Sequence, residues 1–128
     1  METVYLDTHV VVWLFAGELH KLSPRAIELI EANELLISPM VMLELELLHE
    51  IGRLSYSHET ILTSLAESID LHVCDLPFAS ITREATRHTW TRDPFDRMIV
   101  AHAASRNNSI LLSRDRKIRE HYKSAIWR

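Results

Sequence analysis

The chain has a single cysteine, Cys74, so no disulfide can form within it. Its neighbours in LHVCD have the apolar character of a strand, and we therefore expect a buried, inert thiol in a reducing cytoplasm. A basic leader segment is missing, since Glu2 and Asp7 come early, and this predicts that no signal peptide is present. No apolar run reaches about 18 residues, which argues against a membrane span.

Glycine is also scarce, and two glycines are too few for a Gly-rich phosphate-binding loop. The eight histidines show no ligand spacing typical of zinc. An excess of basic residues is missing as well, because the net charge is −4, and this argues against a simple electrostatic nucleic-acid binder. A nuclease that engages phosphates through bound cations is still allowed. The length and the ordinary balance of apolar and charged residues suit a single domain over residues 1–128.

Short apolar runs alternate with longer helical patterns along the chain. Strands are predicted at residues 3–6, 35–37, 71–74 and 110–112, with a possible last strand at 125–127. Helices are predicted at residues 9–16, 23–33, 39–51, 57–69, 94–106 and from 116, and another from Ser80 or Thr82 to about His88. Such alternation requires crossover connections. It therefore predicts an α/β fold, a three-layer α/β/α sandwich with a mostly parallel central sheet of four to five strands.

One acidic residue falls on the apolar face of a predicted helix. In the stretch PMVMLELELLHE, Glu44 lies four residues after Met40 and three before Leu47, in the middle of the apolar stripe. Glu46 and Glu50 fall on the opposite, solvated face. Because an unpaired charge is costly to bury, the sequence predicts that Glu44 has a specific partner.

Three further acidic residues are predicted at one edge of the sheet. Asp7 follows the first strand, Asp115 follows the fourth, and Asp96 lies in the first turn of the helix at 94–106. Helices that follow parallel strands begin at the edge where those strands end, so we expect Glu44 to join these three. Four clustered carboxylates repel one another unless a counter-charge is present. Oxygen ligands suit Mg²⁺ or Mn²⁺, which can polarise a phosphodiester and activate water.

Each acid also has an ordinary structural interpretation. Asp93 is most simply a helix cap before a proline, and Asp96 could then return a capping-box hydrogen bond. Asp7 alone could be a turn residue, and Asp115 alone a surface acid. Glu44 alone could pair with a buried arginine. The coincidence of four acids at one edge favours the metal site.

Hydroxyl and basic side chains flank these acids: Thr8, Arg97, Ser113, Arg114 and Arg116. The hydroxyl groups can orient a ligand or a water, or they can simply cap a turn. The guanidinium groups can hold RNA phosphates, or they are solvated charges, which is the simpler interpretation for Arg116. His9 and His102 are expected to be structural or exposed rather than catalytic.

The sequence resembles, over nearly its whole length, PIN-domain proteins of the VapC toxin type. The matching segments are YLDTHVVVWLFAG, LSPRAIELIE, LLISPMVMLELELLHEIGRL, RDPFDRMIVAHA and LLSRDRKI. The LDTH opening and the RDPFDR block are the most specific. The resemblance implies a PIN-like fold and a Mg²⁺- or Mn²⁺-dependent endoribonuclease, with Asp7 and Asp96 as direct metal ligands and Glu44 and Asp115 completing the acidic set. It also implies a homodimer, and a cognate antitoxin whose tail enters the acidic pocket.

Two features depart from that family. Leu43 stands where many relatives carry tryptophan, which should alter packing rather than chemistry, and Glu46 is an extra acid that we exclude from the site. Other functions also remain open: a PIN nuclease of RNA maturation, an inactive PIN-like binding module, and a phosphotransfer or receiver-like module using Asp7. His9 stands where a haloacid-dehalogenase-like phosphatase has its second aspartate, which counts against phosphotransfer.

Overall fold

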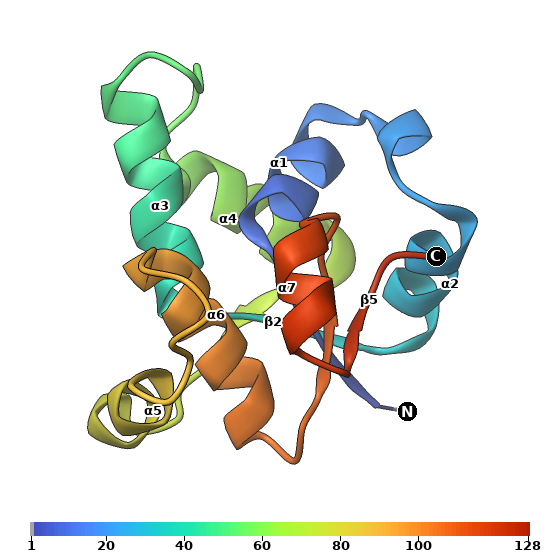
Figure 1. Ribbon diagram of the computed structural model, residues 1–128. Coiled ribbons are helices and arrows are strands. Elements are labelled where there is room, and N and C mark those ends of the chain that lie inside the picture. Colours follow the sequence, from blue (N-terminus) through green and yellow to red (C-terminus); the bar gives the residue numbers. More distant parts are fainter. Residues whose placement is uncertain (1) are drawn as a thin grey trace.

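A five-stranded sheet forms the centre of the protein, and every pair of neighbouring strands runs parallel. The structure is a computed structural model that describes residues 2–128 (Figure 1). The strand order is β3-β2-β1-β4-β5. The strands are β1 (Thr3–Leu6), β2 (Glu34–Ile37), β3 (His72–Val73), β4 (Ile110–Leu112) and β5 (Ala125–Ile126).

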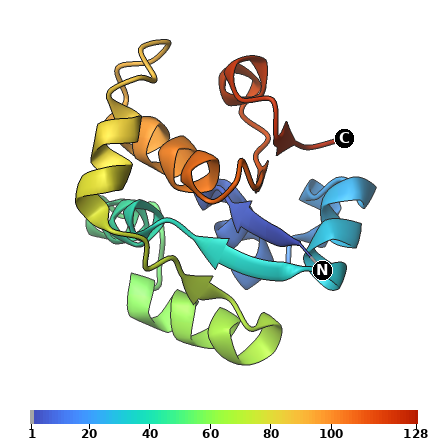
Figure 2. The same ribbon diagram turned by 90° about the horizontal axis from the view of Figure 1, so that it is seen from below.

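Helices cover both faces of this sheet. They are α1 (Thr8–Ala16), α2 (Pro24–Ala32), α3 (Pro39–Glu50), α4 (His58–Ile69), α5 (Phe78–Ala85), α6 (Pro94–Ser105) and α7 (Arg116–His121), with a short 3₁₀ helix η1 (Leu19–Lys21). Helices α6 and α7 lie on one side of the sheet, and α4 lies on the other side (Figure 2). The predicted α/β/α sandwich with a parallel sheet is confirmed.

Side-chain caps explain where most helices begin. Ser23 and Ser38 each accept a hydrogen bond from a backbone N–H of the first turn, and a proline follows each of them. Asp93 caps α6 in the same way, by accepting from two backbone N–H groups. These local signals are legible in the sequence, and the predicted starts of these helices are correct.

The predicted bounds of two elements are wrong. Helix α5 spans Phe78–Ala85, whereas the sequence predicted a start at Ser80 or Thr82 and an end near His88. Pro77 stands at its N-cap position and opens the helix earlier, although proline has no cap side chain to reveal the start. Strand β3 has two residues instead of four, because it is an edge strand that pairs with β2 alone.

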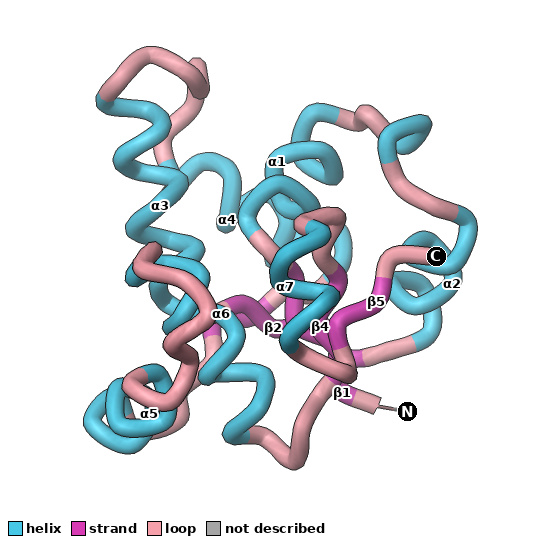
Figure 3. Tube along the Cα trace, viewed as in Figure 1, coloured by secondary structure: helices cyan, strands magenta, loops and turns pink. Residues whose placement is uncertain are grey.

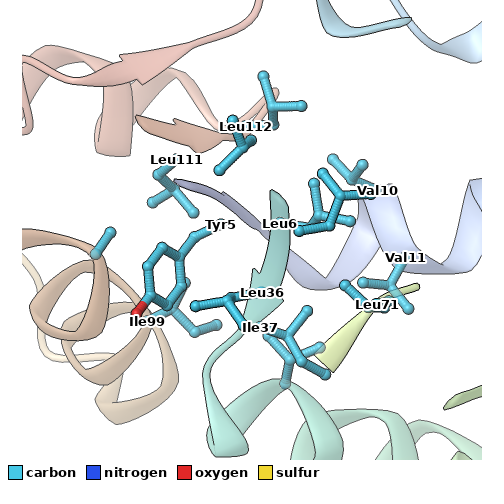
Figure 4. Close-up of a cluster of buried hydrophobic side chains, with 14 of the residues drawn as sticks. Tyr5, Leu6, Val10, Val11, Leu36, Ile37, Leu71, Ile99, Leu111 and Leu112 are labelled. Carbon is cyan, nitrogen blue, oxygen red and sulfur yellow. The ribbon is translucent and has the colours of Figure 1, made fainter. Parts of the chain in front are cut away.

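The core is packed against the central strand β1. Its residues Tyr5 and Leu6 are completely buried, between the neighbouring strands and the helices on either face (Figure 4). The hydroxyl of Tyr5 donates to Cys74 Sγ at 2.9 Å and accepts from Arg106 Nε at 3.0 Å. Cys74 is therefore buried, as expected from the sequence. Within residues 2–128, no helix is long and apolar enough to cross a membrane.

The topology places two strand ends side by side. Strands β1 and β4 are neighbours, with Leu6 in register with Leu112, and both strands end there (Figure 3). The chain continues from β1 toward β2 on one side and from β3 to β4 on the other, so the direction of winding reverses between β1 and β4. Ligands of open α/β sheets bind at such a position, outside the carboxyl ends of the strands.

Candidate active site

Asp7 is the first residue after β1 and caps helix α1. Its Oδ1 accepts from the backbone N–H of Thr8 at 2.8 Å, and its Oδ2 accepts from the Ser113 hydroxyl at 2.6 Å. Ser113 stands directly after β4, so the strand pair itself brings the two side chains together. Asp7 is buried, with only 5% of its surface exposed. Its carboxylate is therefore held in one orientation by the first residue of α1 and the residue after β4.

Glu44 reaches the same place from α3. Its Oε1 accepts a hydrogen bond from the Thr8 hydroxyl. No lysine or arginine lies within ion-pair distance of Glu44 in the part of the chain described, so a buried arginine is not its partner. Glu46 does not line the pocket, and its Oε1 is hydrogen-bonded to His58 Nδ1 at 2.8 Å. This agrees with the prediction that Glu46 is not part of the site.

Asp96 lies in the first turn of α6, beside the capping residue Asp93. Asp93 Oδ1 accepts from the backbone N–H groups of Phe95 and Asp96 at 2.8 and 3.2 Å. The Asp96 carboxylate itself accepts no hydrogen bond from residues 2–128 and returns no capping-box bond. A half-buried carboxylate without a protein partner is suited to binding a cation or a water.

Asp115 caps α7 and is tied to the centre of the site through Ser113. Its Oδ1 accepts from the backbone N–H groups of Lys117 and Ile118. Its own backbone N–H donates to the Ser113 hydroxyl at 3.0 Å. Because the Ser113 hydroxyl also donates to Asp7, it connects two of the four acids.

These residues line one pocket of about 450 Å³. Its acidic residues are Asp7, Glu44, Asp93, Asp96 and Asp115, and its other lining residues are Thr8, His9, Val12, Trp13, Leu48, Arg53 and Leu54. The four acids that the sequence analysis singled out thus share a pocket, although 108 positions separate the first from the last. Asp93 is an addition, since it lines the pocket as well as capping α6.

Burial and mutual repulsion change the proton affinity of these acids. Burial, followed by the charges of Asp93, Asp7 and other pocket acids, raises the pKa of Asp96 from 3.8 to about 7. Burial also raises the pKa of Glu44, although its hydrogen bond from Thr8 opposes this shift. The pocket therefore holds more negative charge than its protein surroundings compensate.

His9 has a supporting position that the sequence did not reveal. Its Nε2 accepts from the backbone N–H of Arg114 at 2.8 Å, so the ring proton is on Nδ1, which lies 3.7 Å from Asp7 Oδ2. Burial lowers the pKa of His9, which keeps the ring neutral. The ring also packs against Trp13, with centroids 5.0 Å apart. No sequence signal identified this bridge, because its partner is a backbone group 105 residues away.

The three arginines near the acids are placed differently from one another. Arg97 Nε donates to the carbonyl of Thr91 at 2.8 Å, and Arg97 does not line the pocket. Arg116 is exposed and pairs with Glu120, as a solvated charge should. Arg114 is exposed and its guanidinium lies 5.9 Å from the centre of the Trp13 ring. Arg53, in the loop after α3, lines the pocket and was not foreseen.

The donor set suits a hard divalent cation. Its members are carboxylate oxygens, and the acidic residues of the pocket outnumber Arg53, the arginine that lines it among the described residues. Over the described residues, no three His, Cys, Asp or Glu side chains are close enough together to bind one ion directly. Mg²⁺ typically takes one or two carboxylates and keeps several waters, and the open pocket can admit those waters. The residues present therefore fit such an ion.

Removing the hydroxyl that connects Asp7 to Asp115 should weaken both the site and the fold. We expect Ser113→Ala to lower the free energy of unfolding by about 1–3 kcal/mol, because a buried hydrogen-bonded network loses its centre. We expect the affinity of the pocket for Mg²⁺ to fall about 10- to 100-fold, because the group that orients Asp7 is lost. Urea unfolding and calorimetric titration with Mg²⁺ measure the two effects. Ser64→Ala on the exposed face of α4 is the control, and equal effects in both variants would contradict this role.

Comparisons with known proteins agree with this geometry. The family model described as PIN domain matches residues 4–124. Ribonuclease VapC22 of Mycobacterium tuberculosis is 34% identical over 124 residues, which cover 94% of this chain and 93% of that protein.

The fold is also found in solved structures. One is a chain in the crystal structure of VapBC2 from Rickettsia felis bound to a DNA fragment from the promoter, with a TM-score of 0.71, 18% identity and coverage of 98% and 99% of the two chains. Another is a chain in DNA-bound VapBC from Salmonella typhimurium, with a TM-score of 0.62, 22% identity and coverage of 97% and 95%. The acidic pocket at the strand ends, the family match and the VapC relative together show that this chain belongs to the PIN-domain family and is of the VapC type.

Proposed function

We propose that the protein is a divalent-metal-dependent endoribonuclease that hydrolyses RNA phosphodiesters. The observation that supports this most strongly is the meeting of Asp7, Glu44, Asp96 and Asp115, from four separate elements, in a pocket whose acids outnumber its one described arginine, Arg53. The 34% identical relative is a ribonuclease. An oxygen-only donor set favours Mg²⁺ or Mn²⁺ as the cofactor.

The residues have different parts in this proposal. Asp7 and Asp96 would hold the ion, which when bound polarises the phosphodiester and makes a water more acidic. Ser113 and Thr8 keep Asp7 and Glu44 in fixed orientations through their hydroxyl groups. Glu44, whose pKa is raised, accepts a proton from the attacking water, and Asp115 orients that water from the side of α7.

We further propose that the protein is the toxin of a type II toxin–antitoxin pair. Two of the solved structures of similar fold are VapBC assemblies bound to DNA, which supports a protein partner for this chain. A homodimer is the expected assembly. Helix α3 and the residue after it carry exposed apolar side chains, Leu43, Leu47 and Ile51, that a partner can cover. Leu43 is 48% exposed, so a tryptophan here would alter the surface and not the core.

Two experiments test these proposals. Purified protein should cleave RNA with Mg²⁺ or Mn²⁺ and lose this activity in EDTA, with recovery on adding the ion back. Expression should arrest growth, and co-expression of the neighbouring small gene should relieve the arrest. Cleavage without growth arrest would favour a nuclease of RNA maturation over a toxin. Mapping of cleaved RNA ends then identifies the target.

A phosphotransfer function is disfavoured by the surroundings of Asp7. Within the part of the chain described, no lysine lines the pocket beside Asp7, and His9 stands where a phosphatase of the haloacid-dehalogenase type has its second aspartate. Formation of an acyl phosphate on Asp7, detected by mass spectrometry after incubation with a phosphodonor, would support that alternative.

A further inference from the structure

A second cavity lies beside the acidic pocket, and its lining is basic. It has a volume of about 450 Å³ and is formed by η1, the start of α2, the loop after β4 and the end of the described chain. Its charged or titratable residues are His20, Lys21, Arg114 and Arg128. No aspartate or glutamate among the described residues lines it. We call it the basic cavity.

Two tryptophans separate the basic cavity from the acidic pocket. Trp13 lines the acidic pocket, Trp127 lines the basic cavity, and their ring centroids are 5.9 Å apart. Two cations of the basic cavity approach the Trp13 ring, with Lys21 Nζ 5.8 Å and Arg114 Cζ 5.9 Å from its centre. The two cavities are therefore neighbours that share one aromatic wall.

Arg114 is fixed relative to the acids on its other side. Its backbone N–H donates to His9, which lies against Asp7, and the next residue is Asp115. Its guanidinium forms no ion pair with any residue described, and neither does the side chain of Arg128.

Among the described residues of the basic cavity, Lys21 is the one that forms an ion pair. It is partly neutralised by Glu18, whose Oε2 lies 2.5 Å from Lys21 Nζ. The two arginines keep their full charge. The basic cavity therefore has a net positive charge next to a strongly negative pocket.

On the α6 side of the acidic pocket the neighbouring arginine does not face the acids, and Arg53, after α3, is the arginine that lines the pocket itself within the part of the chain described. The guanidinium of Arg97 on α6 is engaged with the Thr91 carbonyl and does not line the pocket. A chain with a net charge of −4 gives a polyanion no general attraction, so a local cluster has to supply it. Arginine is well suited to this task because its planar group binds phosphate through two parallel hydrogen bonds.

We propose that the basic cavity binds a backbone phosphate of single-stranded RNA, so that the strand passes from the acidic pocket across Trp13 toward the start of α2. This inference rests on the proposed ribonuclease function. The inference adds the direction in which the RNA strand runs. The substrate extends from the acidic pocket over α1 and α2 and away from α5. In Figure 1 α2 and the C-terminus lie on one side of the molecule, and α5 lies on the other.

The test measures RNA binding in a variant that does not cleave. In an Asp96→Asn background with Mg²⁺, fluorescence anisotropy of a labelled single-stranded RNA gives the Kd at several salt concentrations. We expect Lys21→Glu combined with Arg114→Glu to weaken binding by about tenfold for each phosphate that is no longer neutralised. The slope of log K against log salt should become shallower by about 0.7 for each such phosphate.

Arg83→Glu combined with Arg87→Glu is the matched control, because it reverses two exposed charges, one on α5 and one just after it. Equal weakening in both double variants, with equal slopes, would show a general charge effect and overturn the proposal. Unchanged RNA binding in the Lys21 and Arg114 variant would overturn it too. A third outcome would also overturn it: the Lys21 and Arg114 variant loses binding to polyglutamate but still binds RNA. The basic cavity would then recognise an acidic protein segment.

Cleavage by the protein with Asp96 intact separates this inference from the proposed function. If the unmutated protein cleaves the RNA with Mg²⁺, and the Lys21 and Arg114 variant binds and cleaves it equally well, the basic cavity is not a subsite but the ribonuclease function stands. If the unmutated protein neither binds nor cleaves RNA, both are wrong. Circular dichroism of each variant checks that the fold is retained.

Discussion

Asp96→Asn is expected to reduce the rate of RNA cleavage on the order of a thousandfold, without loss of folded structure. The amide has the same shape as the carboxylate but cannot supply the negative charge that a divalent ion requires. The Asp96 carboxylate has no hydrogen-bond partner among the residues described, so its replacement breaks no protein hydrogen bond. Initial rates with a labelled RNA at saturating Mg²⁺ measure the effect.

Glu46→Gln is the matched control for this prediction. Glu46 is an acid of α3, as Glu44 is, but it bonds to His58 and does not line the pocket. We expect its replacement to change the cleavage rate less than about twofold, because surface ion pairs contribute little. A comparable loss in both variants, or near-normal cleavage by Asp96→Asn, would mean that the acidic pocket is not where the reaction takes place.

The metal-free protein is expected to lose stability as the pH rises from about 4 to about 7. In this range the unfolded chain has already released the proton of Asp96, whereas the folded protein retains it because its pKa is about 7. The folded state therefore binds more protons, and raising the pH favours unfolding. We expect Asp96 to account for about 1–2 kcal/mol, less than the pKa shift alone implies, since solvent screens a half-exposed group.

Urea unfolding in EDTA at pH 5 and pH 8 measures this loss. It should shrink in Asp96→Asn, whose amide does not titrate. Mg²⁺ should restore stability at pH 8 by about 2.7 kcal/mol at one hundred times its Kd, and by less at pH 5, where protons compete for the ligands. If Mg²⁺ stabilises Asp7→Asn and Asp96→Asn as much as the unmutated protein, the ion binds elsewhere and the assignment of these ligands is wrong.

The position of the acids could be predicted from the sequence because it depends on two local features, the helix starts and the strand ends. The pairs Ser38–Pro39 and Asp93–Pro94 mark helix starts through backbone hydrogen bonds within a few residues. Asp7 follows an apolar strand directly, and parallel strands end at a common edge. Helix periodicity separated Glu44 from Glu46, although Leu47, which was predicted in the same apolar stripe as Glu44, is exposed in the structure. The predicted meeting of distant acids needed no knowledge of loop paths.

Only the tertiary structure decided which of the flanking groups face the pocket. Arg97 and Arg114 are both adjacent to a pocket acid in sequence, yet one guanidinium turns to the Thr91 carbonyl and the other lies against Trp13. Asp93 has two roles, because it caps helix α6 and also lines the acidic pocket.

By itself, then, the amino-acid sequence determined the strand and helix pattern, the parallel sheet and the acids at its edge, because capping and periodicity act over a few residues. It did not determine the path of the loops. The basic cavity joins Lys21 to Arg114, and His9 reaches the backbone N–H of Arg114, which lies 105 residues further along the chain. Such contacts depend on how the whole chain packs, since no local hydrogen bond or repeat encodes them.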